Sequence, residues 1–249
     1  MAQRLRKASS YKHGAELLKT DLTFLEDNRE FTKPAKDAAE RRRQRAAQRN
    51  TKLINYAHKI WQACKEIDTT TSLANKYFEN RGLKNVKEET IRFHPAIRNG
   101  ELKQAIPAIL FKVQLFPRAE LSAIHRIYLT QEGCKANVAA PKMALARIAG
   151  SAIWFGEPSA ILAIAEGPEN ALTARYCYNF GFVCSSISAN NFSALTIPKY
   201  VKELILLPDP DNAGLNSYKK AVLSYKAQGV KKIQKAMLDL SSLDSVINV

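Results

Sequence analysis

Residues 204–214 read Leu-Ile-Leu-Leu-Pro-Asp-Pro-Asp-Asn-Ala-Gly. The apolar half of this stretch has the length and composition of a buried strand, and two aspartates follow directly after it. Upstream, a second apolar run, Ile161–Ala165, ends in Glu166. Because ligands in open α/β sheets collect at the carboxyl ends of parallel strands, we expect Glu166, Asp209 and Asp211 to meet at one edge of a sheet.

Three converging carboxylates predict a site for a hard, oxygen-loving cation. Without a cation they would repel one another and their pKa values would rise, so Mg²⁺ or Mn²⁺ is the expected ligand. Asp209 and Asp211 lie two residues apart, which in an extended backbone places both side chains on the same side. An EF-hand is excluded, because its twelfth loop position would be Lys220, where a bidentate glutamate belongs. An ordinary turn after a strand remains the alternative.

The order of predicted elements indicates an α/β fold with a mostly parallel sheet flanked by helices. From residue 161 onward, strands (161–165, 182–187, 204–207, 232–237) alternate with helices (170–180, a short one after 187, 213–228). Before this region, a helix at 72–80 and extended segments at 90–93, 106–116 and 121–129 predict a small α+β subdomain. Residues rich in Ala, Glu, Lys, Arg and Gln between 11 and 67 predict two or more helices. We therefore expect a basic helical region (1–67), an α+β subdomain (68–157) and a metal-binding domain (158–249).

The motifs also carry a resemblance to a known family. A strand ending in Glu-Gly, followed by a strand ending in Asp-x-Asp-x-x-Gly, resembles the Toprim domain of bacterial DnaG-type primases, type IA and II topoisomerases and some nucleases. Residues 77–83 (Tyr-Phe-Glu-Asn-Arg-Gly-Leu), 91–95 (Ile-Arg-Phe-His-Pro) and 125–129 (His-Arg-Ile-Tyr-Leu) resemble the Toprim primase-like proteins of phages, plasmids and other mobile elements. The resemblance extends over most of the chain, from Tyr56 to Leu223.

This resemblance implies a DNA primase-like nucleotidyltransferase that makes short RNA primers on single-stranded DNA from NTPs, with Mg²⁺ or Mn²⁺. It assigns Glu166, Asp209 and Asp211 to catalysis and to the metal site, and Glu166 is either a general base or a metal ligand. Glu169 would support the site from the following helix, although an acid there also complements the helix dipole. Gly167 and Gly214 would let the backbone approach metal or phosphate closely.

Cationic side chains are expected beside the metal, because phosphoryl chemistry depends on positioning and charge stabilisation. The candidates for contact with nucleotide or nucleic acid are His125, Arg126, Lys135, Lys142 and Arg147. Pro141-Lys142 resembles the Pro-Lys of the primase core. Taken singly, each of these residues is equally compatible with an ordinary strand surface or a solvated lysine.

The composition favours a polyanionic partner. Lys and Arg outnumber Asp and Glu 38 to 23, which gives a net charge of +15 and a pI of about 9.7. Such an excess attracts nucleic acid through counterion release and long-range steering. The densest run contains Arg41, Arg42, Arg43 and Arg45, and it predicts either a phosphate-binding helix or a solvated helix face. Since no apolar stretch could span a bilayer and the N-terminus lacks a signal core, we expect a cytoplasmic protein without membrane contact.

Other residue patterns limit the range of functions. The four cysteines, Cys64, Cys134, Cys177 and Cys184, form no Cys-x-x-Cys pair and have no His at zinc-ligand spacing, so we expect no zinc. A zinc module or a helicase would then come from a partner protein, since no phosphate-loop motif is present. Relatives carry an Asp-x-Asn-Asp run near the C-terminus, and here only Asp244 remains. A topoisomerase is disfavoured because no tyrosine stands in a recognisable catalytic context.

Three functions remain open from the sequence. The first is a primase, and the second is a metal-dependent Toprim nuclease, which would use the same carboxylates with water in place of a 3′-hydroxyl. The third is a non-catalytic DNA-binding accessory protein of replication or mobilisation, in which the metal site is weak or vestigial.

Overall fold

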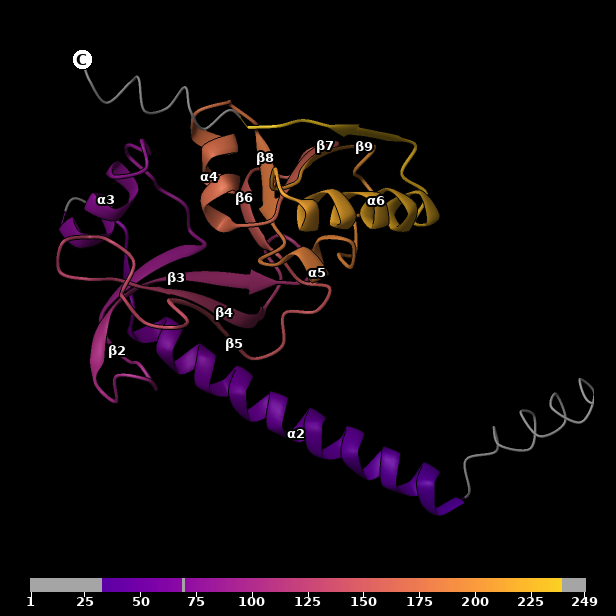
Figure 1. Ribbon diagram of the computed structural model, residues 1–249, viewed down its shortest axis with the longest axis horizontal. Coiled ribbons are helices and arrows are strands. Elements are labelled where there is room, and N and C mark those ends of the chain that lie inside the picture. The colour runs from indigo at the N-terminus through magenta and orange to yellow at the C-terminus, as the bar shows by residue number, and fades with distance from the viewer. Residues whose placement is uncertain (1–32, 69, 239–249) are drawn as a thin grey trace, which may run out of the picture. The chain divides into compact units, whose positions relative to one another are not determined.

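The computed structural model describes residues 33–68 and 70–238. The chain divides into two compact units between Arg49 and Asn50. The first unit is represented by the beginning of the helix α2, Lys33–Ala63, which is rich in Ala, Arg and Gln, and residues 41–49 are exposed (Figure 1). Residues 1–32 of the predicted basic helical region, and Asp244, lie outside the described residues. The predicted boundaries near 67 and 157 stay predictions.

The second unit begins with an antiparallel sheet. Its strands stand in chain order, β1-β2-β3-β4-β5, and every neighbouring pair is antiparallel. Their bounds are Lys65–Glu66 for β1, Ile91–Arg98 for β2, Ala105–Gln114 for β3, Leu121–Tyr128 for β4 and Lys142–Leu145 for β5. The helix α3, Ser72–Glu79, joins β1 to β2. Gly82, which follows α3 with φ 69°, supplies the left-handed conformation that lets the chain leave the helix.

The second sheet is mostly parallel, and its strand order is β10-β9-β7-β8-β6. The strands β7, β8, β9 and β10 run parallel, and only the edge strand β6 is antiparallel to its neighbour. Their bounds are Ile153–Gly156 for β6, Ile161–Ala165 for β7, Phe182–Ser185 for β8, Glu203–Leu207 for β9 and Lys232–Lys235 for β10. The helices between them are α4 (Pro168–Tyr176), α5 (Ala189–Phe192) and α6 (Asn212–Ala227).

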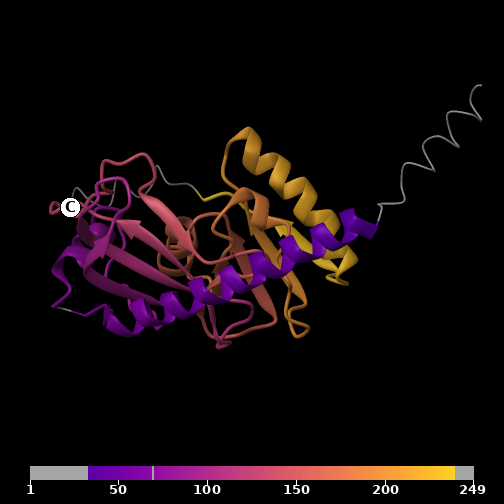
Figure 2. The same ribbon diagram turned by 90° about the horizontal axis from the view of Figure 1, so that it is seen from below.

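The alternation of side chains along the strands divides the core into layers. Ala163 and Ala165 of β7 pack with α4 and with the inner face of the antiparallel sheet, whereas Leu162 and Ile164 pack with α5 and α6. The opposite face of the antiparallel sheet packs against Ala57 and Trp61 of α2. The two sheets lie side by side in both views (Figures 1 and 2). They are joined by backbone hydrogen bonds between Gln114 and Ala152.

The structure agrees with the predicted order of elements and differs in its details. Over the described residues the fold is mixed α/β with two sheets, and the first of them is wholly antiparallel. The strands β1, β5 and β6 were not predicted. In β5 the sequence Lys-Met-Ala-Leu shows no apolar alternation, because this edge strand is largely exposed. The helix α4 ends at Tyr176, before the predicted end at residue 180.

None of the helices in residues 33–68 and 70–238 combines the length and the apolar character that a membrane span needs.

Candidate metal centre and its basic flank

The parallel strands β7 and β9 bring the predicted carboxylates to one edge of the sheet. They are direct neighbours, and their last residues, Ala165 and Leu207, stand opposite each other. Glu166 follows the first strand and Asp209 follows the second after one proline, so both leave the sheet at its carboxyl edge. Glu166 is 6% exposed, which places its carboxylate in the protein interior.

Glu166 is held by the residues around it. Its Oε1 accepts a hydrogen bond from Ser217 Oγ of α6 at 2.8 Å. Burial raises the pKa of Glu166, the hydrogen bond from Ser217 lowers it, and the charges of Asp209 and Asp211 raise it again, with a net increase. A carboxylate under such electrostatic stress would be relieved by a cation.

Asp209 and Asp211 make different contacts. Asp209 Oδ1 accepts from Asn170 Nδ2 of α4 at 2.8 Å, and burial raises the pKa of Asp209. The charge of Asp211 raises that pKa further, whereas the charge of Lys142 lowers it. Asp211 is the N-cap of α6, and its Oδ1 accepts from the Gly214 backbone N–H at 2.7 Å.

The donor chemistry of this edge fits a hard divalent cation, but the side chains are not arranged around one. The charges of Asp209 and Asp211 act on Glu166, and carboxylate oxygens are ligands that Mg²⁺ and Mn²⁺ prefer. Among the residues that the structure describes, however, no group of three or more His, Cys, Asp or Glu side chains is placed to hold a metal ion. The carboxylates of Glu166, Asp209 and Asp211 are instead turned to protein donors. Binding an ion would require them to exchange some of these hydrogen bonds for metal contacts.

Gly214 is needed for close packing of the protein against itself. A Cβ at this position would lie 2.2 Å from the backbone oxygen of Asp209, a distance that no side chain tolerates. The close approach predicted at Gly214 is therefore made by the Asp209 backbone. At Gly167, the N-cap of α4, a Cβ would meet Glu169 Oε2 at an ordinary 3.8 Å.

Glu169 lies at the centre of a basic cluster beside the carboxylates. It stands in the first turn of α4, which begins at Pro168, a favourable first residue for a helix. Lys135 Nζ lies 2.8 Å from its Oε1, and Lys142 Nζ lies 2.8 Å from its Oε2. Burial would raise the pKa of Glu169, but the charge of Lys142 and the hydrogen bonds from both lysines outweigh it and lower the pKa to about 2.

Tyr77 in α3 and Arg81, two residues after the end of that helix, complete this cluster. Neither residue was predicted from the sequence. The Tyr77 hydroxyl donates to Glu169 Oε1 at 2.9 Å, and Arg81 Nε lies 3.9 Å from the same oxygen. The Arg81 guanidinium stacks over the Tyr77 ring at 3.7 Å. Both belong to the Tyr-Phe-x-x-Arg-Gly-Leu segment that carried part of the resemblance, which was the available signal.

His125 and Arg126 point to opposite faces of β4, as neighbours on a strand must. His125 lies on the inner face, where the strand register makes Lys142 its diagonal neighbour, and burial lowers its pKa to about 4. Both ring nitrogens of His125 are buried without a hydrogen-bond partner in the described structure. Arg126 lies on the other face, where its Nη1 donates to the Tyr128 hydroxyl at 3.1 Å.

Of the remaining predicted cations, one lies in the second unit and four lie in the first. Arg147 is exposed, and its backbone N–H donates to Asn50 Oδ1 at 2.9 Å. The four arginines of the α2 run, Arg41, Arg42, Arg43 and Arg45, are exposed and belong to the first unit. The structure therefore brings Lys135, Lys142 and His125 together beside Glu169.

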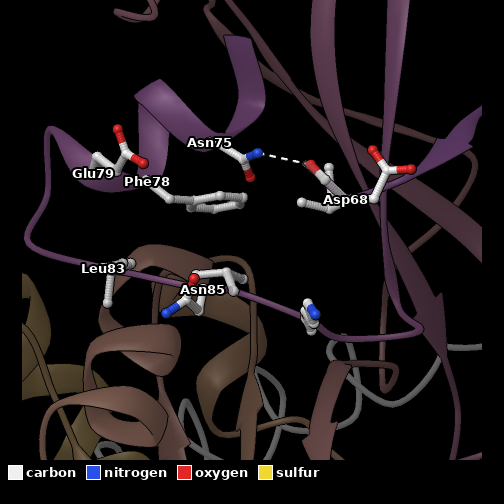
Figure 3. A pocket seen from close by; sticks show the side chains of 9 residues that line it. Asp68, Asn75, Phe78, Glu79, Leu83 and Asn85 are labelled. Atoms are coloured by element: carbon white, nitrogen blue, oxygen red, sulfur yellow. Dashed lines mark hydrogen bonds between the residues drawn. The ribbon is translucent and has the colours of Figure 1, made fainter. Parts of the chain in front are cut away.

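Three cavities of the second unit are lined by both acidic and basic or amide groups and contain none of the predicted site residues. One of them, with a volume of about 250 Å³, lies beside α3, and Asp68, Asn75, Phe78 and Glu79 are among the residues that line it (Figure 3). Asn75 Nδ2 donates to the Asp68 backbone oxygen at 2.7 Å (Figure 3). Two others, of about 380 and 270 Å³, adjoin Glu89 and Arg118.

Comparison with known proteins gives a family match and several similar solved structures. Residues 51–155, less than half of the chain, match a family model described as a domain of unknown function, DUF7146. No curated protein matches. A DNA primase domain from Pseudomonas aeruginosa is similar with 13% identity and a TM-score of 0.48, covering 78% of this chain and 74% of that one. The primase fragment of the bacteriophage T7 primase-helicase protein is similar with 13% identity and a TM-score of 0.42, covering 69% and 67%.

Proposed function

We propose that this protein is a primase-like nucleotidyltransferase that joins ribonucleotides on single-stranded DNA with Mg²⁺ or Mn²⁺. In this proposal the parallel sheet is a Toprim domain, and Glu166, Asp209 and Asp211 hold the metal. The proposal extends the sequence resemblance to the mobile-element primases with the contacts at the carboxyl edge of that sheet.

The observation that carries the proposal is that Lys142 pairs with Glu169 while its charge also acts on Asp209. Its Nζ lies 2.8 Å from Glu169 Oε2, and its charge also lowers the pKa of Asp209. Lysine side chains beside a group of carboxylates suit a nucleoside triphosphate, because metal ions held by the carboxylates and ammonium groups of the lysines can neutralise adjacent phosphates. A purely structural turn at Asp209 would not require this flank.

Each group then has a chemical role. A bound divalent ion would neutralise the triphosphate and lower the pKa of the attacking 3′-hydroxyl. Lys135 and Lys142 would exchange Glu169 for phosphate oxygens, and Arg81 lies close enough to the same carboxylate to join them. Glu166 would act as general base or as ligand, and its raised pKa suits proton transfer.

Product analysis tests the proposal. The protein is incubated with single-stranded DNA, labelled NTPs and Mn²⁺ or Mg²⁺, alone and with a zinc-module or helicase partner from the same mobile element. We expect short oligoribonucleotides and pyrophosphate. Lys142→Ala should depress synthesis, whereas Lys220→Ala, an exposed lysine of α6, should not. Shortened DNA without pyrophosphate would identify a nuclease instead.

One observation favours the non-catalytic alternative. The three carboxylates are turned to Ser217, Asn170 and Gly214, and in the described chain they form no ready metal group. A DNA-binding accessory protein with a vestigial metal site would keep these hydrogen bonds as structural contacts. That function would replace the proposed one if the wild type yields neither oligomer nor cleavage with either metal and with the partner present.

A further inference from the structure

A fourth cavity lies at the opposite edge of the parallel sheet from the carboxylates. It has a volume of about 530 Å³ and is formed where the chain enters β9 and β10. The β9 strand separates it from Asp209, and five residues at about 3.3 Å each span about 17 Å. A ligand in this cavity would therefore leave the carboxylate edge accessible.

The floor of the cavity is apolar and firmly held. Ile197, Val201 and Val230 form it, and all three are buried members of the core around α6. Gln228, after the end of α6, fixes the wall: its Oε1 accepts from the Ile197 backbone N–H, and its Nε2 donates to the Leu195 backbone oxygen, both at 2.9 Å. A preformed apolar floor lowers the entropic cost of binding an apolar group.

The rim of the cavity is cationic. Lys199, Lys202 and Lys231 line it, and all three are exposed. Its lining includes no Asp or Glu from the described parts of the chain, 33–68 and 70–238. The three cavities described above are each lined by acidic residues as well. Glu203, the next residue after Lys202, has its Oε2 bonded to Lys232 Nζ at 2.9 Å. The rim thus presents three positive charges over an apolar floor.

We infer that this cavity binds an acidic segment of a partner protein that carries an aliphatic side chain. The charges of the rim complement carboxylates, and the floor of Ile197, Val201 and Val230 accepts the side chain. Single-stranded nucleic acid fits less well, because such sites combine cations with aromatic stacking platforms, and none of the described residues that line this cavity is aromatic. The site would tether the protein to a partner while the carboxylate edge stays free.

The test measures binding of a fluorescein-labelled decapeptide of aspartates, serines and one central leucine. The variant Lys199→Glu, Lys202→Glu, Lys231→Glu reverses the rim, and Lys84→Glu, Lys219→Glu, Lys220→Glu makes the same change of net charge at other exposed positions. We expect the rim variant to bind about tenfold more weakly or worse, which is about 1.4 kcal/mol over three exposed charge pairs. The control variant should bind nearly as well as the wild type, and replacing the peptide's leucine by serine should also weaken binding.

Several results would overturn the inference. Equal loss in both variants would mean that only net charge matters, and equal binding of the serine peptide would mean that the floor is not used. Loss of oligo-dT binding in the rim variant, with peptide binding unchanged, would assign the rim to nucleic acid. A lower melting temperature of the rim variant with unchanged peptide binding would mean that the lysines only complement the C-terminus of α6. If the triple variant does not fold, Lys199→Gln alone gives the same comparison.

This inference is separable from the proposed primase activity. The peptide is measured without NTP or metal, so binding can succeed even if no primer is made. Conversely, primer synthesis by the rim variant should equal that of the wild type, because the cavity lies at the other edge of the sheet.

Discussion

Replacing Glu169 by Gln should destabilise the protein, and the loss should depend on pH. Glu169 is the shared partner of Lys135 and Lys142, and its side chain is only 15% exposed. Its pKa falls from the ordinary 4.5 to about 2 in the folded protein. Because one pKa unit corresponds to about 1.4 kcal/mol, this fall corresponds to a contribution on the order of 3 kcal/mol.

The expected pH dependence follows from the linkage between proton binding and folding. A carboxyl whose pKa is lowered on folding stabilises the folded state above the unfolded pKa, and it loses this contribution as the pH falls towards the folded pKa. Glu169→Gln should therefore lower the free energy of unfolding most at pH 7. The difference from the wild type should shrink as the pH falls below 4.5 towards 2. The assay is urea unfolding followed by circular dichroism, from pH 7 to the lowest pH at which both proteins fold.

Two controls show whether the loss of stability comes from the contacts of Glu169 with its basic neighbours. Glu120→Gln removes an exposed carboxylate and should change the stability by less than about 0.5 kcal/mol. A double-mutant cycle of Glu169→Gln with Lys142→Met should give a coupling free energy of about 1 kcal/mol or more, because the two side chains are in contact. A stability difference that is small at pH 7, or that does not change with pH, would refute the view that Glu169 is the charged centre of the cluster.

Three further predictions concern other parts of the chain. His125→Phe should flatten the pH dependence of the free energy of unfolding between pH 6.5 and 4, because in that range the histidine binds a proton in the unfolded state but not when it is buried in the folded state. As the pH falls over that range, the free energy of unfolding of the wild type should decrease by about 3 kcal/mol more than that of the variant. Gly214→Ala should lower the free energy of unfolding by about 1–3 kcal/mol, because the new Cβ would collide with the Asp209 backbone oxygen. Gly181→Ala should leave the free energy of unfolding nearly unchanged, because the space around that position is open. Replacing the α2 run, Arg41, Arg42, Arg43 and Arg45, by Gln should flatten the salt slope of single-stranded DNA binding by about 0.7 per lost phosphate contact. As a control, Lys84, Lys103, Lys219 and Lys220 are replaced by Gln in the same way. If the α2 variant leaves the salt slope as unchanged as the control variant does, the run is a solvated helix face.

The parallel sheet could be predicted because its strands are buried on both faces. The runs 161–165 and 204–207 are continuously apolar, and the turns after them carry Glu166 and Asp209. This local information was enough to place the carboxylates at neighbouring strand ends. The edge strand β5 could not be predicted in this way, since an exposed strand shows no apolar pattern.

The contacts of the basic flank could not be predicted from spacing. Glu169 meets Tyr77, which is 92 residues away, and Lys142, which is 27 residues away. Such pairings depend on how α4 packs against the antiparallel sheet, which no local pattern records. The opposite orientations of His125 and Arg126, in contrast, follow from strand periodicity alone. The role of Gly214 also required the structure, because the atom it avoids belongs to the Asp209 backbone.

Calorimetric titration with Mn²⁺ measures whether Glu166, Asp209 and Asp211 bind a divalent cation, as we propose. The wild type should bind Mn²⁺, and binding should be lost in Asp209→Asn, Asp211→Asn while the circular dichroism spectrum stays unchanged, because these substitutions remove charge without creating a cavity. Equal Mn²⁺ binding by the wild type and the double variant would mean that these carboxylates do not hold the cation.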